Sequence, residues 1–211
     1  FLPEALENML LRLGWGHGDD EIISREQAIK WFDLTDVNRS PAQLNYKKLE
    51  SLNTHYMTLA KPERLRDLTL AKIEANLGRE LNVAEKERLL DILPIQAERA
   101  KSLDELAEGA LLYLRAVPLP LDKRAAKALD QSHAEAVIQA TLKALEGVET
   151  LSQDKAKEII QSVMDETGMK MGQVGPVLRA ASCGTMQAPD LALVLSLLGI
   201  ERVKERLNHL I

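Results

Sequence analysis

Apolar residues recur at intervals of three and four along almost the whole of this 211-residue chain. Leu6, Met9 and Leu13 mark one such stripe near the start, and Val203 and Leu207 mark another near the end. This spacing places apolar side chains on one face of an α-helix, and no segment sustains the strict alternation that indicates a strand. Aromatic residues make up only 3% of the sequence, so aliphatic side chains must build the core, which favours helices over sheets. The sequence therefore predicts an all-α fold of consecutive helical bundles.

Local signals predict where several helices begin. The runs 24–27 and 102–105 each fit a capping box, in which a serine side chain accepts from a free amide and a Gln or Glu reaches back. Ser152 is expected to cap a further helix. Pro41 and Pro62 each follow a polar or small residue, and we expect both to open a helix at its first position.

Other residues predict where helices end and which faces are buried. Pro94 is expected to end a helix over 83–93, since proline lacks the amide hydrogen that a helix interior needs. In the helix that follows Pro62, Leu65 and Leu68 are expected to face inward. Glycine is favoured just past a helix C-terminus, and four glycines are expected to act in this way: Gly78, Gly168, Gly184 and Gly199.

The segment Val117-Pro118-Leu119-Pro120 cannot be the interior of a helix, because two prolines remove two amide donors. We interpret it as a joint. Together with composition, it predicts three parts, covering residues 1–58, 59–118 and 119–211. None of the three is basic overall, and the whole chain has a net charge of −5. A binding site for a polyanion such as RNA must therefore be a local basic surface.

Composition and the chain start limit the cellular setting. A single cysteine rules out a disulfide framework, and no stretch approaches the roughly 18 apolar residues needed to span a bilayer. The first residues carry no basic segment of a signal peptide, so we expect a cytoplasmic protein without membrane association. Because the sequence does not begin with Met, we also expect it to start within a longer protein.

A search for catalytic groups predicts neither catalytic residues nor a metal site. The four histidines stand far apart in sequence, and none has a metal-binding spacing to another His or to the cysteine. Cys183 lies in an alanine-rich stretch and is expected to pack as a small apolar group. Gly14, Gly16 and Gly18 suggest a phosphate loop, but they follow a helix and lack a Lys-Ser/Thr pair, so we expect a tight connection.

Several short motifs follow one another along the chain. Those in the first part are Phe1-Leu2-Pro3-Glu4-Ala5-Leu6, Leu11-Arg12-Leu13-Gly14-Trp15, Ser40-Pro41-Ala42, Lys47-Lys48-Leu49 and Leu52-Asn53. Those near the end are Gly172-Gln173-Val174, Leu178-Arg179-Ala180-Ala181, Pro189-Asp190-Leu191 and Leu198-Gly199. In this order and at these separations, they resemble the C-terminal half of bacterial glutamyl-tRNA synthetases, which are class I enzymes.

The resemblance implies a division of labour. The family's catalytic domain carries HIGH-like and KMSKS-like motifs for ATP, and neither is in this sequence. The resemblance thus implies that a full-length enzyme uses ATP and Mg²⁺, whereas this fragment is expected to hold no cofactor. The fragment alone is not expected to make glutamyl-adenylate. The part spanning 1–58 is similar to the family's stem-contact helices. The parts spanning 59–118 and 119–211 are similar to the two subdomains that bind the anticodon.

The resemblance implies that Arg99 reads the last anticodon base, because it matches a family arginine that precedes a Thr/Ser-Leu pair. Arginine offers only hydrogen-bond donors. Cytosine presents acceptors on its pairing edge, whereas guanine presents N1–H and N2–H₂ donors there. Glutamate anticodons end in C and glutamine anticodons end in G. Arg99 is therefore expected to favour tRNA(Glu) and to oppose tRNA(Gln).

The resemblance also implies other tRNA contacts. Lys48 matches a family lysine near the inner corner of the tRNA, and Lys47 is its neighbour; a lysine suits phosphate as a flexible point charge. Arg179 matches a second family arginine, and Pro189 and Leu191 match apolar contacts to anticodon bases. The expected partner is tRNA(Glu), and the expected state is a monomer.

Two alternatives remain open. An all-helical protein-interaction module without RNA binding fits the acidic net charge and the amphipathic helices equally well. A synthetase paralogue that modifies another tRNA fits less well, since such relatives usually lack an anticodon-binding region. RNA binding that weakens steeply with salt would separate the first interpretation from the interaction module.

Overall fold

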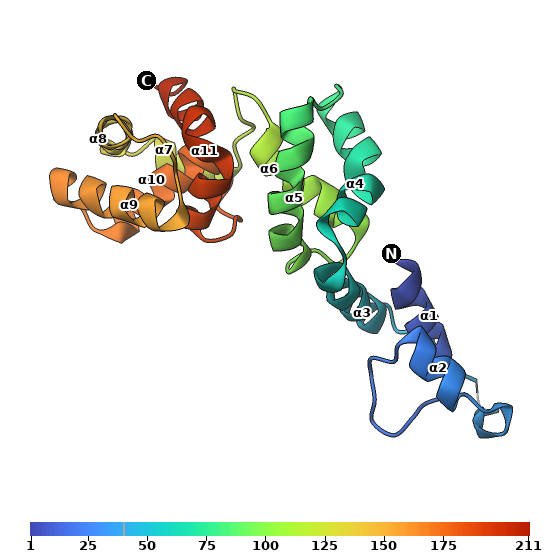
Figure 1. The fold of residues 1–211 in the computed structure, drawn as a ribbon. Helices are drawn as coiled ribbons and strands as arrows, with labels where there is room; N and C mark the ends of the chain where they lie inside the picture. The colour runs from blue at the N-terminus through green and yellow to red at the C-terminus, as the bar shows by residue number, and fades with distance from the viewer. Residues whose placement is uncertain (40) are drawn as a thin grey trace. The chain divides into compact units, whose positions relative to one another are not determined.

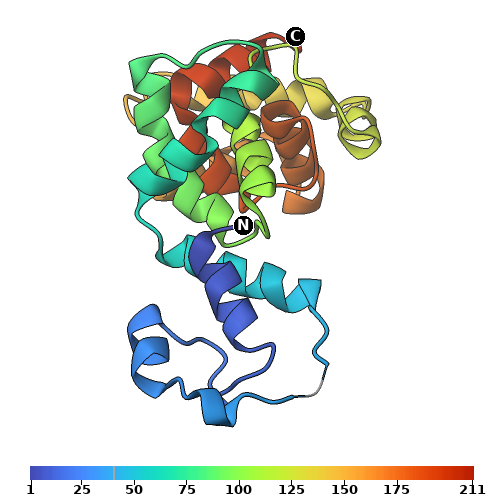
Figure 2. The same ribbon diagram turned by 90° about the vertical axis from the view of Figure 1, so that its right-hand side faces the viewer.

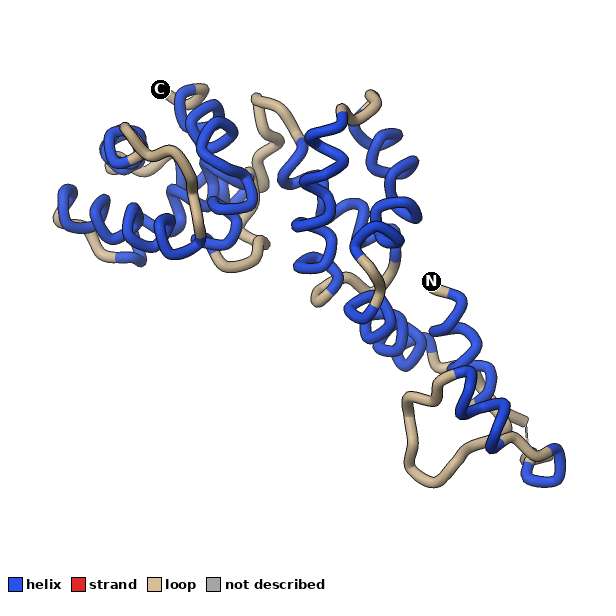
Figure 3. Tube along the Cα trace, in the orientation of Figure 1, coloured by secondary structure: helices blue, strands red, loops and turns tan. Residues whose placement is uncertain are grey.

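The computed structural model describes residues 1–39 and 41–211, so Ser40 of the expected 40–42 motif lies outside the described residues. In these residues the chain forms eleven α-helices and one short 3-10 helix, and no strand (Figures 1 and 3). The prediction of an all-α fold is confirmed. None of the described helices combines the length and the apolar character that crossing a membrane requires. The chain divides into two compact units, Phe1–Leu111 and Leu112–Ile211.

The first unit is built mainly from helix pairs. Its elements are α1 (Pro3–Leu11), α2 (Arg25–Trp31), the 3-10 helix η1 (Leu34–Asp36), α3 (Tyr46–Leu59), α4 (Pro62–Leu77), α5 (Val83–Ala97) and α6 (Leu103–Leu114), whose last residues fall in the second unit. Helices α1 and α3 lie side by side in both ribbon views (Figures 1 and 2). Their contact buries Ala5 and Met9 against Leu49 and Leu52. Helix α4 packs on α5 in the same way.

The predicted helix starts in this unit are largely confirmed. Ser24 and Gln27 form a reciprocal capping box at the start of α2. The hydroxyl of Ser102 accepts from the amide of Glu105 at 3.1 Å, as expected for the start of α6. Pro62 occupies the first turn of α4, and Gly78 ends that helix with a left-handed φ of 69°.

Three predictions for this unit are wrong. Helix α3 begins at Tyr46 rather than near Pro41, because the Asn45 side chain accepts from the first free amides. Helix α5 continues through Pro94 to Ala97, since the buried packing of this last turn outweighs the one backbone hydrogen bond that proline removes. Leu68 is 46% exposed. Thr69 takes the inward position, because it lies four residues after Leu65 and bonds to its carbonyl.

The second unit is organised around one central helix. Its elements are α7 (Lys123–Leu129), α8 (Ala134–Ala144), α9 (Gln153–Thr167), α10 (Met171–Cys183) and α11 (Leu191–Asn208). Helix α10 packs against the other four. The predicted stops at Gly168 and Gly184 are confirmed by left-handed C-caps. Gly199 interrupts α11 with a φ of 72°, so this element is two helices joined at a kink, as expected.

Two features of this unit were not expected from the sequence. Helix α7 is one of them; Asp122 caps it by accepting from two amides of its first turn. The other is Arg206, which is 1% exposed and donates to the carbonyls of Leu112, Arg115 and Ser182. These carbonyls lie at the C-terminal ends of α6 and α10, where a cation is favoured and unpaired carbonyls need donors. Residues 115–122, which include the predicted joint, are not helical.

Candidate nucleic-acid interface

Arg99 lies in the short connection between α5 and α6. Its amide donates to the carbonyl of Gln96 at 3.0 Å, which closes the last turn of α5. Its side chain is exposed rather than packed in the interior. In the part of the chain that the structure describes, no carboxylate pairs with this guanidinium. Arg99 therefore presents all its side-chain donors to the surface of the first unit.

The connection that carries Arg99 is fixed to α3 by two side chains. Asn53 Nδ2 donates to the carbonyl of Lys101 at 2.8 Å, and Thr54 Oγ1 donates to the carbonyl of Ala100 at 2.7 Å. Asn53 is fully buried, and its Oδ1 accepts from the amide of Leu2 at 2.7 Å. One amide side chain thus joins the start of α1, the middle of α3 and the connection beside Arg99.

Lys47 lines the same cleft as Lys101, two residues after Arg99 in the sequence. This cleft has a volume of about 530 Å³ and is lined by residues of α3 together with Lys101. Lys101 Nζ lies 3.3 Å from a carboxylate oxygen of Glu50, whereas Lys47 makes no ion pair within the described residues. The structure therefore brings Lys47 together with the connection that carries Arg99.

Lys48 faces a different cleft of the first unit. That cleft has a volume of about 260 Å³ and also contains Arg12 and His55. Glu21 lies between the two cations, 3.4 Å from Lys48 Nζ and 3.6 Å from Arg12 Nη1. Such exposed ion pairs contribute about 0–1 kcal/mol, so a phosphate can replace Glu21 as the partner of Lys48 at little cost.

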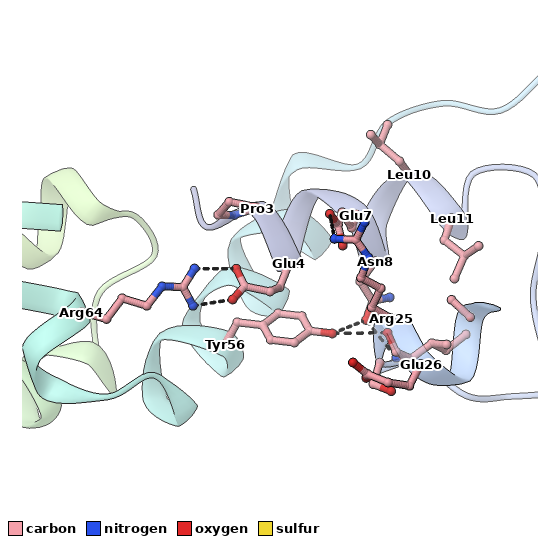
Figure 4. Close-up of a pocket in the computed structure, with 13 residues that line it drawn as sticks. Pro3, Glu4, Glu7, Asn8, Leu10, Leu11, Arg25, Glu26, Tyr56 and Arg64 are labelled. Atoms are coloured by element: carbon pink, nitrogen blue, oxygen red, sulfur yellow. Dashed lines mark hydrogen bonds and ion pairs between the residues drawn. The ribbon is translucent and has the colours of Figure 1, made fainter. Parts of the chain in front are cut away.

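A groove of about 770 Å³ runs along α1, and both of its arginines are paired with glutamates of α1. Figure 4 shows the Arg64 guanidinium facing both carboxylate oxygens of Glu4, an arrangement that lowers the pKa of Glu4 through this hydrogen bonding. The Tyr56 hydroxyl donates to Asn8 Oδ1 at 2.8 Å, and burial raises the pKa of Tyr56. These bonds fix α1 to α3 and α4 and have a structural role.

In the second unit, Arg179 and Pro189 are in direct contact. Arg179 Nη1 donates to the carbonyl of Pro189 at 2.6 Å and to that of Ala188 at 3.0 Å. Arg179 thus holds the connection between α10 and α11 and keeps further donors for a ligand. Pro189 is partly exposed on this connection. Leu191 is only 2% exposed and packs into the core, so this geometry does not support its expected contact with a base.

The described residues hold no group of three His, Cys, Asp or Glu side chains placed to bind a metal ion. Cys183 is buried as expected, and burial raises the pKa of its thiol to about 11. A thiol with this pKa stays protonated near neutral pH and is a poor nucleophile.

Sequence reasoning missed the residues that position Arg99, namely Asn53, Thr54 and Lys101. One signal was available for Asn53. It lies four residues after Leu49 and four before Met57, both buried, so a helical α3 places a polar amide on its apolar face. A buried amide needs partners, but the sequence does not show that they are Leu2 and Lys101.

The family model and similar curated proteins point to the same family. Residues 50–211 match the sequence family described as the anticodon binding domain. Glutamate–tRNA ligase 2 of Zymomonas mobilis is 44% identical over 210 residues, which are 99% of this chain and 43% of that protein. Glutamate–tRNA ligase 2 of Rhizorhabdus wittichii is 45% identical over 207 residues, which are 98% of this chain and 44% of that protein. The chain therefore spans less than half the length of these curated relatives.

Solved structures agree with the sequence comparison. The crystal structure of a glutamate tRNA ligase from Elizabethkingia meningosepticum, in complex with its amino acid, superimposes with a TM-score of 0.84 at 27% identity. The match covers 100% of this chain and 41% of that one. The glutamate–tRNA synthetase from Elizabethkingia anophelis matches with a TM-score of 0.80, also at 27% identity, over 100% of this chain and 40% of that one.

Proposed function

Because the chain belongs to the anticodon-binding-domain family and corresponds to that region of glutamate–tRNA ligases, we propose that it binds tRNA(Glu) and reads its anticodon. The observation that carries the proposal is the exposed Arg99 guanidinium on a connection that Asn53 and Thr54 hold rigidly. A rigid support matters because hydrogen bonds select between bases only when the donor cannot move to suit each one.

Arg99 discriminates through the chemistry of the base edge. Its donors meet acceptors on cytosine, the last base of glutamate anticodons. On guanine, the last base of glutamine anticodons, they meet N1–H and N2–H₂ donors. When two donors face each other, neither finds an acceptor, and each group then costs about 1–3 kcal/mol of desolvation free energy. Arg99 thereby selects tRNA(Glu) over tRNA(Gln).

The lysines strengthen RNA binding but do not distinguish between bases. Lys47 and Lys101 share one cleft with the Arg99 connection, so a strand whose base reaches Arg99 can place a phosphate between them. Lys48 takes a phosphate in place of Glu21. Phosphate contacts set the register of the RNA without reading sequence.

In the second unit, Arg179 and Pro189 form the other part of the binding surface. Arg179 braces the backbone of the connection, and the partly exposed ring of Pro189 offers an apolar face to a splayed base. Attachment of glutamate, with ATP and Mg²⁺, would take place on the part of the relatives that this chain does not match. We keep a monomer as the expected state.

The decisive experiment measures binding of the chain to two tRNA(Glu) transcripts that differ only in the last anticodon base, C or G, over a range of salt. We expect about 10- to 100-fold tighter binding to C. Arg99→Ala should abolish this ratio. Arg88→Ala removes the same charge from the neighbouring helix α5 and should keep the ratio.

Two results would contradict the proposal. Equal affinity for both transcripts would remove the role of Arg99. Absence of any salt-dependent RNA binding would favour the all-helical interaction module instead, because contacts with phosphates release counterions and must weaken as salt rises.

A further inference from the structure

A pocket of about 570 Å³ lies between α7 and α10 in the second unit. Its walls carry Arg124 and Lys127 from α7, Gln131 and His133 from the segment that follows, and Met186 from the connection that precedes α11. Arg124 and Lys127 lie three residues apart and therefore on one face of α7. None of these five residues is a contact that the family resemblance assigned.

Every charged or ionisable residue that lines this pocket is basic. Within the described residues, neither Arg124 nor Lys127 forms an ion pair. Other cations of the chain, such as Lys72, Lys143 and Lys155, are instead paired with carboxylates on the surface. A planar guanidinium and a point-charge ammonium at one pocket, with no carboxylate, are the donors that suit a phosphate.

Within the described residues, the carboxylate at the start of α7 forms hydrogen bonds with neighbouring groups and no ion pair with Arg124 or Lys127. Asp122 Oδ1 accepts from the amides of Arg124 and Ala125, at 2.8 and 2.7 Å. Its Oδ2 accepts from Thr185 Oγ1 at 2.7 Å and from the amide of Met186 at 3.2 Å. Both oxygens are thus engaged by the protein.

The same bonds make the pocket rigid. Asp122 ties the first turn of α7 to the connection between α10 and α11, and its own amide donates to the carbonyl of Gly184 at 2.9 Å. Gly184 has a φ of +70°, and a Cβ there would lie 2.3 Å from the carbonyl oxygen of Pro120. Only glycine permits this close approach, which holds the end of α10 against the segment that precedes α7.

Continuity with Pro189 indicates what the pocket binds. Met186 lines the pocket, and Pro189, which is held by Arg179, lies three residues further along the same connection. A single strand with one base against Pro189 must carry its phosphodiester backbone past neighbouring residues. Sites for single-stranded nucleic acid combine an apolar platform for bases with a basic groove for the backbone.

We propose that the pocket between α7 and α10 binds a backbone phosphate of single-stranded RNA through Arg124 and Lys127. The proposal rests on the proposed function and extends it, by adding a phosphate subsite on an element outside the assigned contacts. Because phosphates are the same at every position of RNA, this subsite strengthens binding and fixes register without changing the preference for the last anticodon base.

The test combines a protein variant with a modified RNA. The double variant Arg124→Gln and Lys127→Gln keeps polar side chains at both positions while removing both charges. We expect it to weaken binding about 10-fold to the C and G transcripts alike, and to reduce the salt slope by about 0.7 for each phosphate lost. The control variant Lys155→Gln and Lys157→Gln removes two charges from α9 and should leave the slope unchanged.

Neutral methylphosphonate linkages, placed one at a time in a synthetic anticodon stem-loop, identify the phosphate. At one or two positions the linkage should weaken binding to the unaltered chain but not to the α7 double variant. If no position shows this coupling while the C-over-G preference persists, the subsite is wrong and the proposed function stands. If the chain binds neither transcript, the proposed function fails as well. Competition by inorganic phosphate equal to that by the stem-loop would show a general anion site instead and contradict the proposal.

Discussion

Asn53 Nδ2 donates to the carbonyl oxygen of Lys101 at 2.8 Å, so a buried residue of α3 fixes the connection that displays Arg99. The same amide accepts from Leu2 at the start of α1. The position of the exposed Arg99 guanidinium, for which we propose a role in reading an anticodon base, therefore depends on an interior residue. Asn53 is a positioning residue for Arg99.

Replacing Asn53 with Ala should lower both stability and anticodon discrimination. The change leaves the Leu2 amide and the Lys101 carbonyl without partners, at a cost of about 2–4 kcal/mol in the free energy of unfolding. Urea unfolding measures this cost. Once the Arg99 connection is released, the ratio of affinities for the C and G transcripts should also fall. Asn76→Ala, on the exposed side of α4, should change neither quantity. An unchanged ratio in a folded Asn53→Ala chain would contradict the positioning role.

Gly184→Ala should destabilise the second unit more than Gly168→Ala. Both glycines end a helix with a left-handed φ, of 70° and 67°, which costs alanine about 1–2 kcal/mol. A Cβ at Gly168 meets nothing within 4 Å, whereas one at Gly184 would overlap the backbone of Pro120. We therefore expect a total loss of about 3 kcal/mol or more for Gly184→Ala in urea unfolding. Equal losses for the two variants would mean that the backbone moves apart freely at this point.

The second unit should lose stability in acid, because Asp122 becomes protonated there and its ionised form is the one that stabilises the fold. Hydrogen bonds from Ala125 and Thr185 are the main causes that lower the pKa of Asp122 from 3.8 to about 2. A carboxyl group whose pKa is lower in the folded than in the unfolded chain stabilises the fold above the unfolded pKa. That contribution is lost as the pH falls from about 4 to about 2. In urea unfolding over a pH series, Asp122→Asn should flatten the decline in this window. Asp91→Asn, on the exposed side of α5, should not.

Arg206→Met should destabilise the second unit strongly, although methionine removes a buried charge. Burial already lowers the pKa of Arg206 to about 10, so the cation carries a desolvation cost. The loss of donors to Leu112, Arg115 and Ser182 outweighs the relief of that cost, and we expect about 2–4 kcal/mol in chemical denaturation. Lys204→Met, two residues earlier on α11, should stay within about 0.5 kcal/mol. A neutral or stabilised Arg206→Met chain would show that the three carbonyls find other partners.

The sequence was a good guide wherever a structure depends on hydrogen bonds between near neighbours. Ser24 and Ser152 cap helices, and Gly168 ends one, because each acts on backbone groups within a few residues of itself. Pro94 shows the limit of such rules. Its local preference against a helix interior is real, yet the buried last turn of α5 outweighs it.

One short helix escaped detection because it depends on contacts that are distant in the sequence. Helix α7 has seven residues and little apolar periodicity, so its existence depends on the Asp122 cap and on packing against α10. The motif resemblance also implied a base contact for Leu191, because matching residues in order does not show which side of a helix is covered by a neighbour. The predicted three-part division stays a prediction beside the two compact units of the structure.

From the sequence alone came the helical class, most helix ends and the motif resemblance that singles out Arg99 and Arg179. Apolar periodicity and capping are encoded within single turns, and motifs survive in residue order. Tertiary structure alone decided that Asn53 holds the Arg99 connection, and that Arg124 and Lys127 share an acid-free pocket with Met186. These relationships join residues as many as 62 positions apart, as from Arg124 to Met186, and only the packing of the helices determines which distant backbone and side-chain groups meet.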